Sequence, residues 1–136
     1  MVLSGSITPS AAYEDAVIYL REKFPNLTIN ISNGNCYIRF ADNNVKTILL
    51  NNSIGDGIGV SVSDASTANL GTLLKGNTNI TSFNEFKYFT RANTNPSNNM
   101  FEGCSNLSQV DLSEMLTVSN YEFKDTSITS INAPNL

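Results

Sequence analysis

The sequence predicts an α+β fold in which a small α-β-β-β module, residues 1-63, is followed by a short array of stacked repeats, residues 64-136. Three observations predict this organisation. A helical pattern of apolar residues lies near the N-terminus, an alternation of apolar and polar residues follows it, and the second half of the chain repeats its own pattern.

The first element is an amphipathic helix over residues 9–23. Thr8 is a suitable N-cap residue, and Pro9 takes the first helical position, where proline is favoured. Pro25 ends the helix. Apolar side chains at helical spacing give it one apolar face, formed by Tyr13, Ala16, Val17, Leu20 and Phe24.

A strand and a hairpin are predicted next. Residues 27–31 alternate apolar and polar side chains, which is the period of a half-buried strand. The dipeptide Asn33-Gly34 is a strong hairpin signal, and residues 36–40 resume the alternation after it. Together they predict two antiparallel strands.

The module is predicted to end with one or two further strands. After a polar turn at residues 42–44, the mostly apolar residues 45–50 indicate a third strand. Glycines at positions 55, 57 and 59 break the chain before Val60 and Val62, where a fourth strand is an open alternative. A short helix capped by Ser63 or Asp64 is then expected to end near Leu74.

The second half of the chain is self-similar. Residues 74–83 match residues 101–110 in pattern, position by position. Residues 123–131 give a third copy at a shorter spacing, with one residue deleted before Ile128. Self-similarity at a nearly fixed spacing is typical of stacked repeat architectures, in which each copy covers the apolar face of its neighbour.

The middle copy, Phe101-Glu-Gly-Cys-Ser-Asn-Leu-Ser-Gln-Val-Asp-Leu112, resembles the BspA-like leucine-rich repeats. The first copy departs from that pattern at Leu74 and Asn77, and the third departs from it at Asp125 and Thr126. The resemblance covers about residues 70 to 136 and implies a short irregular leucine-rich-repeat solenoid. The predicted repeat core is Leu74, Ile80, Phe83, Phe101, Leu107, Val110, Leu112, Phe123, Ile128 and Ile131.

For function, the resemblance implies recognition through an extended surface. Such repeats are similar to those of bacterial surface adhesins and of structural proteins from phages that infect Bacteroidetes. The expected role is a non-enzymatic virion protein, such as a fibre, spike or head or tail accessory component, acting in assembly or host attachment. The alternative is a fragment of a bacterial cell-surface adhesin.

The start of the chain favours the virion hypothesis at this stage. The first ten residues lack the basic start and the apolar stretch of a secretory signal. A virion protein is made in the host cytoplasm and released by lysis, whereas an adhesin must be exported. The expected partners are other virion proteins or copies of the same chain, and a host surface receptor is a further candidate.

Composition excludes several other functions. The net charge is −4 and no basic run occurs, so neither nucleic acid nor membrane insertion is expected. The chain contains no histidine, which removes the usual general base and the commonest zinc ligand. We therefore expect no enzyme activity, no cofactor and no metal.

Two polar segments are interpreted as turns and not as ligand sites. The glycine-rich residues 55–59 lack the Lys-Ser/Thr of a phosphate-binding loop. The cluster at residues 42–44 has too few spaced oxygens for a calcium loop. Cys36 and Cys104 are expected to be free thiols, with a disulfide between them as the alternative.

Two features indicate a binding surface. The array stops midway through a repeat, so either more chain is expected to follow or a partner subunit is expected to cover the apolar groups near its end. Residues 90–99 lengthen the first repeat and are expected to project as a loop, although an inert connection is the alternative. The candidate interaction residues are Tyr88, Phe89, Arg91, Asn95, Met115, Leu116 and Leu136.

Overall fold

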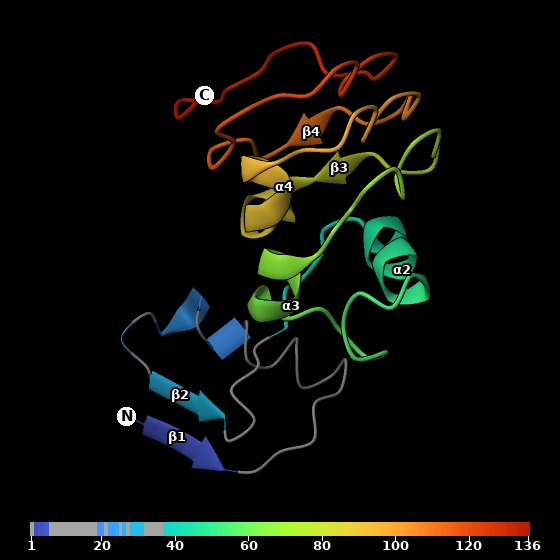
Figure 1. The fold of residues 1–136 in the computed structure, drawn as a ribbon. Helices are drawn as coiled ribbons and strands as arrows, with labels where there is room; N and C mark the ends of the chain where they lie inside the picture. The colour runs from blue at the N-terminus through green and yellow to red at the C-terminus, as the bar shows by residue number, and fades with distance from the viewer. Residues whose placement is uncertain (1, 6–18, 21, 25, 27, 32–36) are drawn as a thin grey trace.

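A computed structural model of the chain describes residues 2–5, 19–20, 22–24, 26, 28–31 and 37–136. These residues form an α+β fold of short helices and two small parallel sheets. From α2 onward the chain rises as a series of stacked coils, and the C-terminal coil lies at the end furthest from α2 (Figure 1).

The first sheet joins the start of the chain to the predicted first strand. β1, Val2–Gly5, pairs in parallel with β2, Thr28–Ile31. The strand predicted over residues 27–31 is confirmed for 28–31, but its described neighbour is β1 and the pairing is parallel. Parallel strands need a long crossover between them, and the chain between residues 5 and 28 is long enough to supply one.

The predicted helix and hairpin are only partly described. Residues 19–20 and 22–23 are helical, and the Phe24 N–H donates to the Leu20 carbonyl at 2.9 Å. The rest of the helix predicted over residues 9–23, the Asn33-Gly34 turn and Cys36 lie outside the described residues. The second hairpin strand is wrong for residues 38–40, which form no strand, and Tyr37 makes an isolated bridge to Ser61.

The third predicted strand is also wrong, because residues 45–50 belong to a helix. α2 spans Asn43–Asn51, and the carboxylate of its N-cap Asp42 accepts a hydrogen bond from the Asn44 N–H at 2.9 Å. Val45 and Leu49 are one helical turn apart, and both are completely buried. A short apolar run does not distinguish a strand from a buried helix, and here the cap decides.

A helix replaces the optional fourth strand. α3, Val62–Thr67, is capped by Ser61, whose side chain and that of Asp64 form a reciprocal capping box. The helix predicted from Ser63 or Asp64 therefore exists, but it begins earlier and ends at Thr67. Val62 is half exposed because it lies on the outer side of this short helix.

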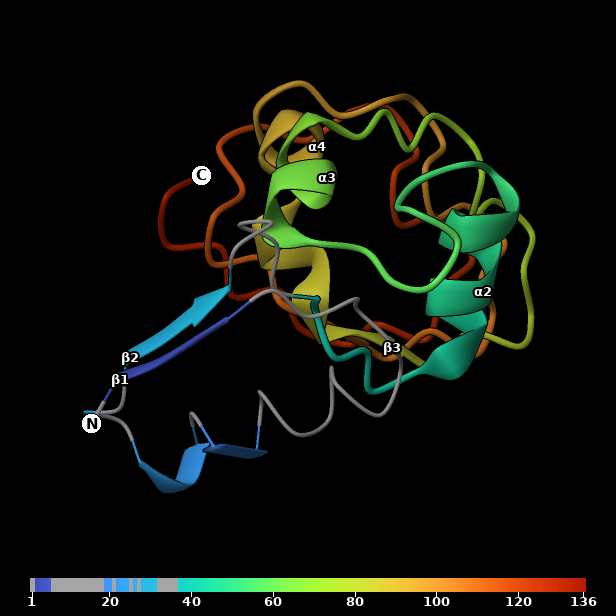
Figure 2. The same cartoon turned by 90° about the horizontal axis from the view of Figure 1, so that it is seen from below.

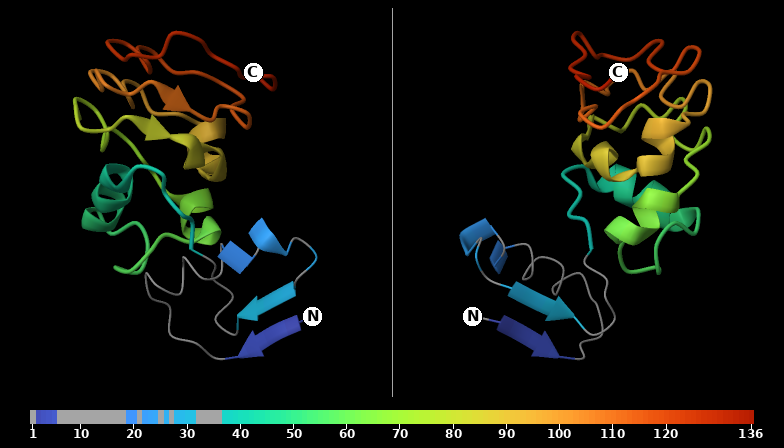
Figure 3. Two further views of the ribbon diagram at one scale, coloured as in Figure 1. Left: turned by 180° about the vertical axis from the view of Figure 1, so that it is seen from behind. Right: turned by 60° about the vertical axis from the view of Figure 1, so that its left-hand side comes forward.

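The repeat copies lie directly above one another. β3, Ser82–Phe83, pairs in parallel with β4, Gln109–Val110, in the register of the sequence repeat. Between these strands run the 3-10 helix η1, Asn84–Tyr88, and α4, Thr90–Thr94. Seen from behind in Figure 3, the successive coils form layers above α2 and α3.

Backbone hydrogen bonds join equivalent positions of successive coils. The Gly76 N–H donates to the Glu102 carbonyl at 2.7 Å, and the Gly103 N–H donates to the Lys124 carbonyl at 2.9 Å. The donors at this position share a left-handed backbone, with φ of 72° at Gly76 and 76° at Gly103. The third copy keeps the same conformation at Asp125, where φ is 57°.

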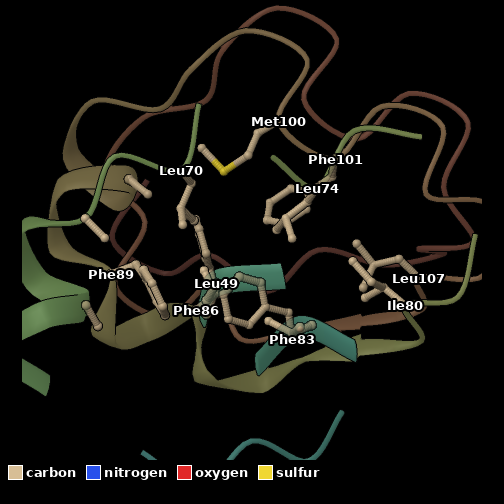
Figure 4. Close-up of a cluster of buried hydrophobic side chains, with 14 of the residues drawn as sticks. Leu49, Leu70, Leu74, Ile80, Phe83, Phe86, Phe89, Met100, Phe101 and Leu107 are labelled. Carbon is tan, nitrogen blue, oxygen red and sulfur yellow. The ribbon is translucent and has the colours of Figure 1, made fainter. Parts of the chain in front are cut away.

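One hydrophobic core runs through the stack. Seen from below in Figure 2, α2 lies on one side and α3 with α4 on the other. Phe83 contacts the rings of Phe86, Phe89 and Phe101 edge-on, with centroids 5.2 to 6.3 Å apart (Figure 4). The core is continuous from Ile38 to Met115, so the predicted boundary at residues 63 and 64 falls inside it.

Most predicted repeat-core residues lie in this core. The side chains that are at most 2% exposed are Leu74, Ile80, Phe83, Phe101, Leu107 and Leu112. Val110, Phe123 and Ile128 are partly buried and pack against it. The prediction is wrong for Ile131, which is 53% exposed, because it lies on the last coil and no further coil covers it.

Candidate interaction surface

The two ends of the stack differ, and the end nearest α2 is closed. One oxygen of the Asp42 carboxylate caps α2, while the other accepts a hydrogen bond from the Thr81 N–H at 2.7 Å. The Asn44 amide donates to the Asn79 carbonyl at 3.2 Å. Burial alone would raise the pKa of Asp42, but the hydrogen bonds from Thr81, Asn44 and Ser82 outweigh it and lower the pKa.

The opposite end of the stack carries exposed apolar side chains. Those of Leu116, Val118, Tyr121, Ile131 and Leu136 are between 49% and 66% exposed. We call these five residues, together with Lys124, the end surface. Exposed large apolar side chains are candidates for contact with another protein.

The backbone at this end also lacks partners. In the coil below, the N–H groups of Asn99, Phe101 and Gly103 donate to the carbonyls of Asn120, Glu122 and Lys124 at 2.9 to 3.0 Å. Their equivalents on the last coil are Tyr121, Phe123 and Asp125. Within the described part of the chain, these three N–H groups donate no hydrogen bond. We call them the donor row.

A ladder of alternating charge runs up the same side. Lys75, Glu102 and Lys124 occupy equivalent positions of the three copies. The Lys75 Nζ lies 2.7 Å from one Glu102 carboxylate oxygen, and the Lys124 Nζ lies 3.2 Å from the other. One carboxylate therefore bridges two ammonium groups from different coils.

This ladder perturbs the titration of its central member. Hydrogen bonds from Lys75, Asn99 and Lys124 lower the pKa of Glu102 to about 2. The charge of Lys124 is correspondingly stabilised, because its hydrogen bond to Glu102 raises its pKa. Lys124 is half exposed and has a second, longer contact to Asp125 at 3.7 Å.

The predicted loop at residues 90–99 is partly a helix. Residues 90–94 form α4, and the buried Asn93 amide donates to the carbonyls of Phe86 and Phe89. Phe89 is completely buried, so its assignment to an interaction surface is wrong: its ring packs on Phe83. Tyr88, Arg91 and Asn95 are exposed.

The other predicted interaction residues divide between the core and the surface. Leu116 and Leu136 are exposed and belong to the end surface. Met115 is completely buried, so that prediction is wrong. It is the counterpart, one coil later, of Asn93, which is also buried. Sequence reasoning missed Val118, Tyr121 and Lys124, although aligning the repeats places Lys124 above Glu102.

The last coil also buries a carboxyl group. Glu122 is 2% exposed, and one of its oxygens accepts hydrogen bonds from the Ser119 N–H and hydroxyl. The other oxygen is buried without a partner. Burial raises the pKa of Glu122, although the bonds from Ser119 act in the opposite direction. The equivalent position one coil below is the apolar Met100.

In the glycine-rich segment, the backbone N–H groups donate to a carboxylate of the same segment, that of Asp56. Asp56 accepts hydrogen bonds from the N–H groups of Ile58 and Gly59, each at 3.0 Å, and from the Tyr37 hydroxyl. The donors that a phosphate group would need are therefore taken. Among the residues described, no three His, Cys, Asp or Glu side chains are placed to hold a metal ion.

A shallow hollow of about 240 Å³ opens beside β4 on the side of the third copy. In the described part of the chain, β4 pairs with β3 alone. Its lining has no acid, base or thiol and consists of Asn84, Ser108, Gln109, Val110, Leu112, Ile128, Ser130 and Asn132.

Cys104 is a buried free thiol, and its Sγ donates to the Leu74 carbonyl at 2.9 Å. No helix in the described ranges is long and apolar enough to cross a membrane. Comparison with protein-family models, with curated proteins and with solved structures finds no match to the chain.

Proposed function

We propose that this chain is a non-enzymatic assembly protein of the BspA-like leucine-rich-repeat type, and that the end surface is where it binds another protein. The setting that we propose is a bacteriophage virion, as part of a fibre, a spike or a head or tail accessory structure. The observation that carries the assembly role is the contrast between the two ends of the stack. One end is closed by α2 and Asp42, whereas the other exposes Ile131 and Leu136.

The repeat geometry supports the assignment to a solenoid. Backbone hydrogen bonds join equivalent positions of successive copies, and each copy contributes buried apolar side chains to one core. A repeat buries its apolar face by packing against a neighbour, and Ile131 and Leu136 are left exposed on the last described coil. A partner protein that covers them gains apolar burial at a surface that is already ordered.

The virion setting is proposed from the sequence resemblance. Immunolabelling of purified phage particles tests it. Antibodies against the chain, detected by gold labelling in electron microscopy, should mark purified particles of the phage that encodes it. Labelling of the surface of uninfected bacteria, with none on particles, would favour the adhesin alternative.

A surface variant tests the assembly role separately. Replacing Ile131 and Leu136 with Ser should abolish incorporation of the chain into particles while leaving its far-ultraviolet circular dichroism unchanged, because both side chains are already exposed. Ile58→Ser is the matched control, since Ile58 is 40% exposed but lies outside the end surface. Normal incorporation of the double variant would refute a role for the end surface.

A further inference from the structure

The strongest unassigned feature is the hollow beside β4. Its lining combines side chains of the second copy, such as Gln109 and Val110, with side chains of the third copy, such as Ile128 and Ser130. Asn84, which begins η1, completes the lining from the coil below. At about 240 Å³, the hollow is smaller than the roughly 300 to 1,000 Å³ of sites for drug-sized ligands. It therefore has room for one small molecule or for one unit of a longer chain.

The apolar part of the lining is continuous with the hydrophobic core. Leu112 is 2% exposed, and Val110 and Ile128 are partly buried and pack against the core. The exposed members of the lining are all polar, and they are Asn84, Ser108, Gln109, Ser130 and Asn132. The hollow therefore has an apolar base and a polar rim, which is the division expected of a small-molecule site.

Most side chains of the polar rim are available to a ligand. Within the described chain, all of them except Ser108 make no hydrogen bond or ion pair with another residue. Elsewhere on the stack, side-chain amides are bonded to the neighbouring coil. The Asn106 amide donates to the Thr78 carbonyl, and the Asn135 amide donates to the Ser113 carbonyl, each at 2.7 Å. The rim therefore presents three amides and one hydroxyl whose donors and acceptors remain unused by the protein.

The lining is uncharged, and this restricts the ligand. Asp111 lies between Val110 and Leu112 in the chain, but its carboxylate pairs with the Lys87 Nζ at 3.2 Å. A charged ligand would find no counter-ion in the hollow, so the cost of removing its water would not be offset. Amide and hydroxyl groups can both donate and accept hydrogen bonds, so they match a neutral ligand whose own groups do both. Hydroxyl groups have this property, whereas a carboxylate only accepts and an ammonium group only donates.

A sugar unit meets both requirements, because its hydroxyl groups lie around the edge of a ring whose faces carry C–H groups. We propose that the hollow binds one neutral sugar unit. The side-chain amides of Asn84, Gln109 and Asn132 bond its hydroxyl groups, and Val110 and Ile128 contact an apolar face of its ring. The hollow contains none of the residues of the end surface, so this binding activity goes beyond the proposed assembly contact.

A neutral peptide fits the hollow less well. Its backbone amides also donate and accept hydrogen bonds. Three extended residues already span about 10 Å, however, so most of their amide groups would lie outside a hollow with room for one unit.

Nuclear magnetic resonance of the full chain tests the proposal, because the side-chain amide resonances of Asn84, Gln109 and Asn132 report directly on the rim. Methyl glycosides of glucose, galactose, mannose and N-acetylglucosamine are added in turn. At least one should shift these three resonances with a saturable dependence in the millimolar range. The side-chain amides of Asn52 and Asn93 are internal controls and should not move, because they are already bonded to backbone carbonyls outside the hollow.

The form of the sugar distinguishes two sources of the ligand. A methyl glycoside represents a unit joined to a longer glycan, whereas the free sugar represents a soluble molecule. Equal binding of both forms would indicate that the hollow accepts a unit at the end of a glycan. Binding of the free sugar alone would indicate a soluble sugar.

Rim variants test the assigned residues. Gln109→Ala and Asn132→Ala should each weaken binding at least about threefold, which is the scale of one neutral hydrogen bond. Asn95→Ala is the matched control, since Asn95 is also an exposed asparagine but lies outside the hollow, and it should bind like the wild type. Circular dichroism should be unchanged in all three variants, because each of these side chains is exposed. The wild-type titration decides alone if a rim variant does not fold.

Three results would overturn the proposal. The first is the absence of saturable shifts at the rim with every sugar up to roughly 100 mM. The second is a shift of the same size with an equal concentration of glycerol, which would indicate a general effect of hydroxyl compounds. The third is a shift with N-acetyl-triglycine amide but with no sugar, which would indicate a peptide site. None of them bears on the proposed function, because the Ile131 and Leu136 double variant measures incorporation into particles.

Discussion

The Asp42 carboxylate accepts the Thr81 N–H at 2.7 Å, across 39 positions of the chain. The same carboxylate caps α2 through the Asn44 N–H. One side chain therefore starts a helix and fixes the entry to β3. Because Asp42 is only 7% exposed, water does not readily replace the bonds that it makes.

Removal of this carboxylate should destabilise the whole stack. We expect Asp42→Ala to lower the free energy of unfolding by about 2 to 3 kcal/mol, because the helix loses its cap and the Thr81 N–H loses its acceptor. Urea unfolding followed by circular dichroism measures the change. Asp64→Ala, which removes the carboxylate that accepts the Ser61 N–H at the start of α3, should cost about 1 kcal/mol. Equal losses in the two variants would show that the Thr81 contact contributes nothing.

The effect of Asp42 should depend on pH. Its pKa is lowered from the usual 3.8, so its contribution is present above that value and is lost as the pH falls through the folded-state pKa. The stability difference between the wild type and Asp42→Ala should therefore shrink in strong acid. A difference that stays constant down to that range would contradict the assignment.

Glu122 should have the opposite pH dependence. Burial raises its pKa above the usual 4.5, so the folded state holds its proton more tightly than the unfolded state. Stability from this group is full below that value and falls as the pH rises through the folded-state pKa. We expect Glu122→Gln to be more stable than the wild type by about 1 kcal/mol at pH 8, because an unpartnered buried charge is removed.

Thermal unfolding of Glu122→Gln at pH 4 and pH 8 checks this expectation. The gain should appear at pH 8 and be small at pH 4. Glu114→Gln is the matched control, since Glu114 is exposed on a neighbouring part of the chain and its substitution should change little. A Glu122→Gln variant that is less stable than the wild type at both pH values would argue against the assigned burial cost.

Backbone conformation at the repeat position of Gly76, Gly103 and Asp125 gives a paired prediction. Asp125 has φ of 57°, which a side chain disfavours, so Asp125→Gly should stabilise the fold by roughly 0.5 kcal/mol. Gly103→Ala should destabilise it by more than about 1 kcal/mol, since its φ is 76° and the new Cβ would lie 3.3 Å from the Gly76 Cα. Chemical denaturation measures both, and opposite signs are required.

Cys104 should resist thiol reagents in the folded protein. Its side chain is completely buried, and burial raises its pKa, so little reactive thiolate is present. In a Cys36→Ser background, labelling by a chromogenic disulfide should occur only after denaturant is added. Rapid labelling without denaturant would show that the second copy opens readily.

Sequence patterns predicted spacings in the second half of the chain, and they predicted the elements of residues 37–63 less well. The spacings between the copies reappear as the spacings of hydrogen bonds between coils, because stacking forces equivalent backbone groups together. The strand prediction for residues 45–50 was wrong because a short apolar run fits either a strand or a buried helix. The helix cap at Asp42 had been interpreted as a turn.

The candidate surface was predicted only in part. Leu116 and Leu136 were among the predicted interaction residues and are exposed, whereas Met115 and Phe89, which were also predicted, are completely buried. Which of two neighbouring apolar residues faces inward depends on the local turn, and these irregular coils have no fixed period from which to derive it. The donor row consists of backbone N–H groups, so the residue types at these positions do not predict it.

The closed end of the stack precedes the open end in the chain. Residues 37–68, which include α2 and α3, leave the ribosome before the coils that rest on them. Each later coil can then pack on the coil synthesised just before it, to which its backbone hydrogen bonds connect it. The protein is therefore suited to fold in the order of its synthesis, layer by layer, without waiting for its C-terminus.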